Sequence, residues 1–94
     1  MRRLAWHTSF RRAFKRCSRN RPDASDRILA ALTNLLEDPF DPRLKTHKLR
    51  GKLEGLLACW VEYDCRIVFA LAKDPESGDD LIVLVDIGTH DEVY

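Results

Sequence analysis

The sequence predicts an α+β fold in the order β-α-α-β-β-β, with a helical hairpin packed on one face of a small, mostly antiparallel sheet. Apolar residues recur at helical spacing between residues 8 and 38, whereas three short apolar runs separated by polar turns follow residue 55. The chain has 94 residues, of which 45% are hydrophobic and 33% charged, a composition that suits a folded protein with one core. We therefore expect a single domain over residues 1–94.

The first part of the chain predicts one short strand and a helix. Leu4 to Trp6 form the expected strand, and Thr8 or Ser9 has the chemistry of an N-cap for the helix that follows. Pro22 disfavours helical backbone in the residue before it, so this helix is expected to end near Asn20. Its apolar stripe consists of Phe10, Ala13, Phe14 and Cys17.

A second helix is expected between Asp23, which can cap its start, and Pro39, which ends it. Its apolar residues repeat at helical spacing: Ile28, Leu29, Leu32, Leu35 and Leu36. The short connection between the two helices predicts an antiparallel hairpin. Such a hairpin covers one face of a sheet and leaves the other face open, and the open face is where a functional site is expected.

The second half of the chain predicts a three-stranded meander. The strands are expected at about Leu56 to Tyr63, Arg66 to Ala72 and Leu81 to Ile87. The connections between them are short and polar, which favours antiparallel pairing. Gly88 closes the last strand, and residues 89–94 form a short tail.

The net charge of +1 hides a strong separation of charge along the chain. Residues 1–22 carry eight basic side chains and no acid, residues 43–52 carry five more and no acid, and residues 53–94 carry ten acids and two bases. This separation indicates either a surface for a polyanion or two solvated basic segments. Under the first interpretation the candidate RNA-binding residues are Arg11, Arg12, Lys15, Arg16, Arg19, Lys45, Lys48, Arg50, Lys52, Trp60 and Arg66.

Several classes of protein are excluded or disfavoured. No apolar run reaches the length of a membrane span, and the first residues lack the apolar core of a signal peptide. Three cysteines without a Cys-x-x-Cys spacing indicate reduced core residues, which are Cys17, Cys59 and Cys65. We therefore expect a cytoplasmic protein without a membrane, metal or cofactor requirement.

Polar residues that suit acid–base chemistry lie at the expected strand ends and connectors, where sites are commonly built. His47 precedes the meander, Asp64 lies at its first turn, and His90 and Tyr94 follow its last strand. Metal-free RNA cleavage needs a base for the 2′-hydroxyl, an acid for the leaving 5′-oxygen and cations for the phosphorane, and this set can supply them. The alternative is that each of the four is an ordinary surface, turn or tail residue. Trp60 is either a core residue or a ring that stacks a base.

Three segments together resemble the RelE/ParE superfamily of toxins, and within it the branch of YafQ-type mRNA interferases. The resemblance covers essentially the whole chain, in the order of the expected elements. It depends on His-Lys-Leu-x-Gly-x-x-x-Gly at residues 47–55, Tyr-Asp-x-Arg-Ile at residues 63–67, and Ile-Gly-Thr-His-Asp-Glu-Val-Tyr at residues 87–94.

The resemblance implies the toxin of a type II toxin–antitoxin pair, which enters the ribosomal A site and cuts mRNA without a metal. Its implied partners are a cognate antitoxin protein, the ribosome and mRNA. The family's catalytic positions match the residues chosen above on chemical grounds, namely His47, Asp64, His90 and Tyr94.

Two positions depart from the family's pattern. Trp60 stands where YafQ-type toxins carry a second strand histidine, and Leu57 stands where an arginine is often found. The alternative function is therefore a binding module that cleaves no RNA, either a ParE-like inhibitor of DNA gyrase or a relic that only binds its antitoxin. Retention of His47, Asp64 and His90 favours the nuclease.

Overall fold

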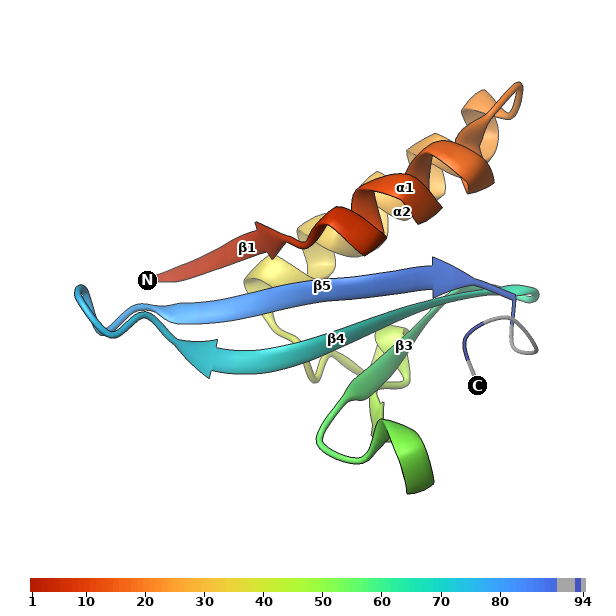
Figure 1. Ribbon diagram of the computed structural model, residues 1–94. Coiled ribbons are helices and arrows are strands. Elements are labelled where there is room, and N and C mark those ends of the chain that lie inside the picture. Colours follow the sequence, from red (N-terminus) through yellow and green to blue (C-terminus); the bar gives the residue numbers. More distant parts are fainter. Residues whose placement is uncertain (90–92, 94) are drawn as a thin grey trace.

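The computed structural model describes residues 1–89 and 93. Two helices lie over one face of a strongly twisted sheet, and a single-turn helix at residues 51–53 lies on the other side (Figure 1). In chain order the elements are β1 (Arg2–Trp6), α1 (Thr8–Ser18), α2 (Pro22–Glu37), η1 (Pro42–Leu44), β2 (His47–Lys48), η2 (Gly51–Leu53), β3 (Leu57–Glu62), β4 (Cys65–Lys73) and β5 (Asp80–Gly88). The expected α+β fold is confirmed, with one addition, because a two-residue strand β2 lies in what the sequence indicated as a connector.

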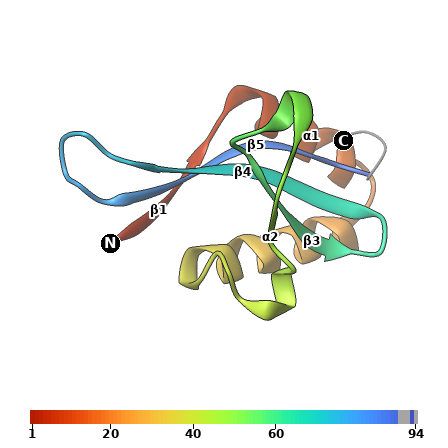
Figure 2. The same cartoon turned by 90° about the horizontal axis from the view of Figure 1, so that it is seen from below.

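The five strands form one sheet in the order β1-β5-β4-β3-β2 (Figure 2). The expected meander is present, since β3 pairs antiparallel with β4 and β4 with β5, and β2 pairs antiparallel with β3. Strand β1 pairs in parallel with β5, with Arg2 opposite Asp80 and Trp6 opposite Leu84. The sheet is therefore mixed, and β1 and β2 are its two edges.

The core lies between the helices and the sheet. The apolar stripe of α1 is buried as expected, with Phe10 fully covered and in edge contact with Trp6 at a centroid distance of 5.2 Å. From α2 the buried side chains include Ile28 and Leu35, whereas Leu29 is 45% exposed because it lies on the outer face of the helix. The other residues of this core come from alternate positions of the strands and from η1, among them Leu44, Cys59, Ile67, Phe69, Ile82, Leu84 and Ile87.

The helix caps differ from those expected from the sequence. The N-cap of α1 is His7, whose Nδ1 accepts a hydrogen bond from the backbone N–H of Ser9 at 3.2 Å, so the helix starts one residue earlier than a Thr8 cap would allow. The helix α2 starts at Pro22, which occupies its first turn, and Asp23 lies inside the helix rather than at its cap. A proline suits this position because its missing N–H has no partner there in any case.

The first two arginines hold the parallel edge strand in place. The guanidinium of Arg2 donates to the backbone oxygens of Leu36, at 2.9 Å, and of Glu37, the last residue of α2. Arg3 forms an ion pair with Asp74 in the β4–β5 turn. Cations at the C-terminal end of a helix also interact favourably with its dipole. Part of the N-terminal basic cluster is therefore structural.

Among the described residues, no helix is both long enough and apolar enough to cross a bilayer.

Candidate active site on the open sheet face

Two rows of residues cross the face of the sheet opposite the helices. Directly paired residues point to the same face, and Ile67 and Phe69 point to the helices, so Arg66 and Val68 point away from them. One row runs from Trp60 through Arg66 to Gly88. The next row on the same face runs from His47 through Ala58 and Val68 to Asp86.

The face is not fully open, which corrects one expectation from the sequence. Ala58 and Val68 lie in its middle, and their side chains are 0% and 2% exposed. Val93 is buried as well, outside the core cluster between the helices and the sheet, and its N–H donates to the oxygen of Thr89 at 3.1 Å. The accessible part of this face is therefore confined to the regions on either side of this apolar centre.

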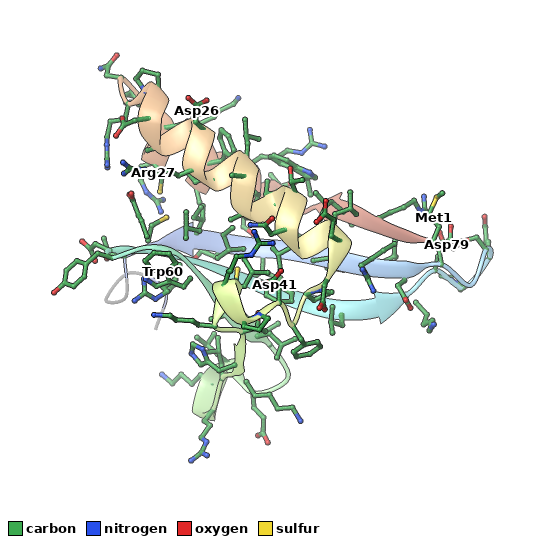
Figure 3. All side chains as sticks on the ribbon, turned by 180° about the vertical axis from the view of Figure 1, so that it is seen from behind. Met1, Asp26, Arg27, Asp41, Trp60 and Asp79 are labelled. Atoms are coloured by element: carbon green, nitrogen blue, oxygen red, sulfur yellow. The ribbon has the colours of Figure 1, made fainter. Side chains whose placement is uncertain are left out.

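Trp60 lies on the open face, half-buried, on the side of the sheet away from α2 (Figure 3). The alternative that it is a core residue under the helices is therefore wrong. The ammonium of Lys45 lies over its ring, 5.3 Å from the ring centroid, a distance typical of a cation–π contact. Lys45 and Trp60 bring a positive charge and an aromatic surface to one end of this face.

His47 lies on β2, exposed, at the same edge of the sheet. Its Nδ1 forms a hydrogen bond with the backbone oxygen of Lys45 at 3.1 Å. A carbonyl oxygen can only accept, so Nδ1 carries the hydrogen and the lone pair of the neutral ring is on Nε2. This tautomer is the one that can take a proton through Nε2.

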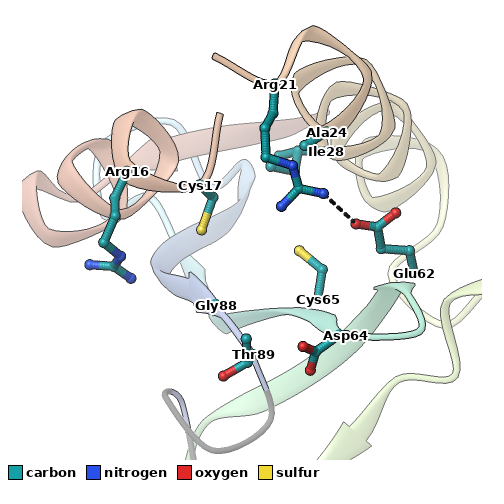
Figure 4. Close-up of a pocket in the computed structure, with 10 residues that line it drawn as sticks. All are labelled: Arg16, Cys17, Arg21, Ala24, Ile28, Glu62, Asp64, Cys65, Gly88 and Thr89. Atoms are coloured by element: carbon teal, nitrogen blue, oxygen red, sulfur yellow. Dashed lines mark ion pairs between the residues drawn. The ribbon is translucent and has the colours of Figure 1, made fainter. Parts of the chain in front are cut away.

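Asp64 lies at the opposite end of the site, in the turn between β3 and β4. It lines a cavity of about 220 Å³ between this turn and the turn that joins α1 to α2 (Figure 4). Gly88 and Thr89 line the same cavity, so the structure brings Asp64 next to the residue that precedes His90 in the sequence. His90 and Tyr94 lie outside the described residues, and their roles stay predictions.

His47 and the Asp64 cavity are not adjacent. His47 pairs with Ala58 near the start of β3, whereas Asp64 follows the end of that strand at Glu62, and four residues of strand span roughly 13 Å. The sequence-predicted site therefore consists of two parts, with Lys45, His47 and Trp60 at the β2 edge and Asp64 at the β3–β4 turn, where Thr89 lines the same cavity.

Arg66 lies between the two parts, and its guanidinium faces the backbone. Its Nη1 donates to the oxygens of Glu62, Tyr63 and Cys65 at 2.7, 3.2 and 3.1 Å, which closes the β3–β4 turn around it. This role was missed by sequence reasoning, which selected Arg66 for RNA binding. Because Asp64 lies in the turn, Arg66 also fixes the position of this candidate carboxylate.

The two basic clusters lie on different sides of the sheet. Helix α1 lies over one face, whereas η2 lies on the side of the sheet away from α1 (Figure 1). Among the basic residues of α1, Arg16 reaches the sheet, since its guanidinium donates to the oxygen of Ile87 at 3.2 Å. The exposed candidates are Arg11, Arg12, Lys15 and Arg16 on α1, its C-cap Arg19, and, in the other segment, Lys45, Lys48, Arg50 and Lys52.

Asp86 is a carboxylate on the open face that sequence reasoning did not select. It is half-buried on β5, opposite Val68, and its Oδ1 accepts from the backbone N–H of Ile87 at 2.8 Å. A lone acid between apolar residues in the run Leu-Val-Asp-Ile is the signal that could have identified it. Sequence alone could not show whether this acid points to solvent or to the site.

The cysteines are core residues, as expected. Cys59 and Cys65 are buried, Cys17 is half-buried, and none of these three described residues forms a disulfide. Burial raises the pKa of the Cys59 and Cys65 thiols to about 12, so both stay protonated at neutral pH. Within residues 1–89 and 93 there is no group of three side chains that could hold a metal ion.

The fold and this polar face define a small α+β toxin of the kind that the sequence resembles. Residues 2–94 match the family described as YafQ, a bacterial toxin of type II toxin–antitoxin systems. The match spans nearly the whole chain, so the protein belongs to the YafQ family of type II toxins. A search of curated proteins gave no match.

Solved structures of such toxins share the fold. The YafQ toxin of Escherichia coli BL21(DE3) superposes with a TM-score of 0.78 at 19% identity, covering 100% of this chain and 99% of that chain. YafQ in the E. coli DinJ–YafQ toxin–antitoxin complex gives a TM-score of 0.70 at 17% identity, with coverage of 97% and 94%. A copper-bound mutant toxin from Helicobacter pylori is 30% identical, with a TM-score of 0.73 and coverage of 100% of both chains. The expected membership of the RelE/ParE superfamily is confirmed.

Proposed function

We propose that this toxin is an endoribonuclease that cleaves mRNA on the ribosome by acid–base chemistry of its own side chains. The observation that carries the proposal is the polar end of the open face, where the Lys45 ammonium lies over the Trp60 ring and the Lys45 carbonyl accepts a hydrogen bond from the His47 imidazole. An RNA strand that crosses this face meets a base, a cation and a stacking surface at one edge of the sheet.

The reaction balances without an added reagent. A base takes the proton of the 2′-hydroxyl, and the 2′-oxygen forms a bond to phosphorus while the bond from phosphorus to the 5′-oxygen breaks. An acid gives its proton to the leaving 5′-oxygen, so the products are a 2′,3′-cyclic phosphate and a 5′-hydroxyl. We assign the base and the acid to His47 and His90, with Asp64 holding an imidazole in one tautomer.

The basic segments are proposed to bind ribosomal RNA and mRNA in the cytoplasm. They hold thirteen of the sixteen basic residues in two segments that contain no acid. Association with the ribosome should weaken steeply as salt rises, because each neutralised phosphate releases counterions.

The proposed protein partner is a cognate antitoxin, as in the DinJ–YafQ complex. The free edge of β1 offers unpaired backbone groups to an added strand. Beside this edge lies a groove of about 520 Å³ lined by Trp6, Phe14, Arg11 and Lys15. An apolar floor with two cations suits an acidic antitoxin segment that carries a large apolar side chain. Arg11→Glu with Lys15→Glu should weaken copurification with the product of the neighbouring gene.

Induced expression in bacteria, with mapping of the 5′ ends of mRNA, tests the nuclease directly. We expect arrested translation and new 5′ ends within translated codons. Trp60 and Leu57, which replace polar residues of the family pattern, favour the second candidate, a toxin-fold module that only binds. Arrested growth with intact mRNA and inhibited gyrase supercoiling would support that alternative, and harmless expression with antitoxin binding would support a relic.

A further inference from the structure

Lys45 occupies a defined place at the edge of the open face. The ladder between β2 and β3 pairs His47 with Ala58 and Lys48 with Leu57. Lys45 lies two residues before His47, outside this ladder, and its ammonium reaches the ring of Trp60 on the open face. The ammonium lies 5.3 Å from the ring centroid in this cation–π contact.

The backbone around Lys45 is held by several hydrogen bonds. Its N–H donates to the oxygen of Pro42 at 3.2 Å, and its own oxygen accepts from His47 Nδ1 at 3.1 Å. The hydroxyl of Thr46 donates to the oxygen of Pro39 at 2.6 Å. Lys45 itself adopts left-handed backbone angles, with φ at +49°, a conformation that is unfavourable for a residue with a Cβ atom. Such a conformation persists where its surroundings enforce it, and it is concentrated at functional sites.

The two contacts of Lys45 link the cation to the candidate base. Its side chain is held by the Trp60 ring, and its carbonyl orients the His47 ring. The cation opposite Trp60 on β4, Arg66, donates to carbonyl oxygens around the β3–β4 turn, so its Nη1 is directed at the protein backbone. Lys45 therefore contacts the Trp60 ring through its ammonium and His47 through its carbonyl.

We propose that the Lys45 ammonium contacts the scissile phosphate of the RNA and stabilises the charge of the phosphorane, and that Trp60 is a positioning residue that acts through Lys45. This inference rests on the proposed nuclease function. A cation held in place before the reaction stabilises a developing charge without reorganisation. It also gives Trp60 a role that an indole can perform, because the ring does not transfer a proton at neutral pH.

The test compares Lys45→Met with Lys45→Arg on programmed ribosomes at saturating concentration. Lys45→Met keeps a long apolar side chain and removes the charge, and it should lower the maximal cleavage rate on the order of 10²–10³-fold. The ribosome concentration at half-saturation should change by less than about threefold, because one phosphate contact is a small part of the total charge contact. Lys45→Arg should recover part of the rate. Lys73→Met, at the far end of β4, removes a lysine outside the site and should cleave at the wild-type rate.

The role of Trp60 is tested by a double-mutant cycle. Trp60→Leu should lower the rate in the wild-type background and have little further effect in the Lys45→Met background, whereas Trp60→Phe should keep most of the rate. Circular dichroism of each variant checks that the fold is intact. If the wild-type protein cleaves and folded Lys45→Met cleaves equally well, or if the two losses multiply, this inference is wrong while the nuclease stands. If the wild-type protein cleaves no RNA, both fall.

Discussion

Trp60 of β3 lies directly opposite Arg66 of β4 on the open face, and the Lys45 ammonium lies over the Trp60 ring. The Arg66 guanidinium donates hydrogen bonds to three carbonyl oxygens of the β3–β4 turn. Arg66, which was selected from the sequence as an RNA-binding residue, therefore stabilises the turn that carries Asp64.

Replacing Arg66 tests this structural role. Arg66→Ala should lower the free energy of unfolding by about 1–3 kcal/mol, because hydrogen bonds from a charged donor are lost and half-buried carbonyls lose their partner. Arg66→Lys should recover little, since a single ammonium cannot reproduce the planar fork. Urea denaturation measures the effect. An unchanged unfolding midpoint together with weaker ribosome binding would show instead that Arg66 serves RNA.

Trp60 and Phe69 allow a matched comparison of the two faces of the sheet. Phe69 is fully buried under the helices, so Phe69→Ala should cost about 3–5 kcal/mol as a core cavity. Trp60→Ala removes a half-buried ring from the open face and should cost less than half as much, while it impairs cleavage. Thermal melts of both variants measure the difference. Equal losses of stability would mean that Trp60 is a core residue in solution.

The catalytic candidates should differ in their contribution. We expect His90→Ala to lose on the order of 10²–10⁴ in cleavage rate, the range for a general acid or base, with the fold intact. Asp64→Asn should lose less, because it orients an imidazole rather than transferring the proton. His47→Ala should fall between them or have a mild effect. Single-turnover cleavage on programmed ribosomes ranks the three, and a wild-type rate for His90→Ala would favour the binding-module alternative.

The outer face of α1 should contribute to ribosome association. Arg12→Glu with Arg19→Glu reverses two exposed charges and avoids Arg16, which donates to the Ile87 oxygen. We expect weaker cosedimentation with ribosomes and a shallower dependence of affinity on salt, by about one unit of slope per lost phosphate contact. Unchanged cosedimentation would mean that this stripe is a solvated face.

The buried thiols predict a loss of stability at alkaline pH. Burial raises the pKa of Cys59 and Cys65 to about 12, whereas thiols of the unfolded chain titrate near pH 8.5. Their contribution is therefore complete below about pH 8.5 and is lost as pH rises towards 12, because the unfolded state releases protons first. Urea unfolding between pH 8 and pH 10.5 measures this slope. Cys59→Ala with Cys65→Ala should flatten it, and an unchanged slope would assign it to other groups.

Local patterns in the sequence predicted most of the fold. The spacing of Phe10, Ala13 and Phe14 indicated which side of α1 is buried, since helical periodicity follows from backbone geometry alone. Strand β2 was not predicted, because two residues carry no periodic signal and pair only when β3 lies beside them. The cap of α1 was also missed, because a histidine accepts an N-cap hydrogen bond only in one tautomer and one ring orientation.

The sequence by itself determined the helical hairpin, the meander, the separation of charge and the resemblance that identified the toxin family. The candidate residues His47 and Asp64 could also be chosen from the sequence, because their chemistry depends on side-chain type. Only the tertiary structure decided which of them lie together. Strand register decides the face on which Trp60 lies, the contact of Lys45 with the Trp60 ring, and the hydrogen bonds from Arg66 to the β3–β4 turn. Register is set by pairing between segments that are distant in the chain.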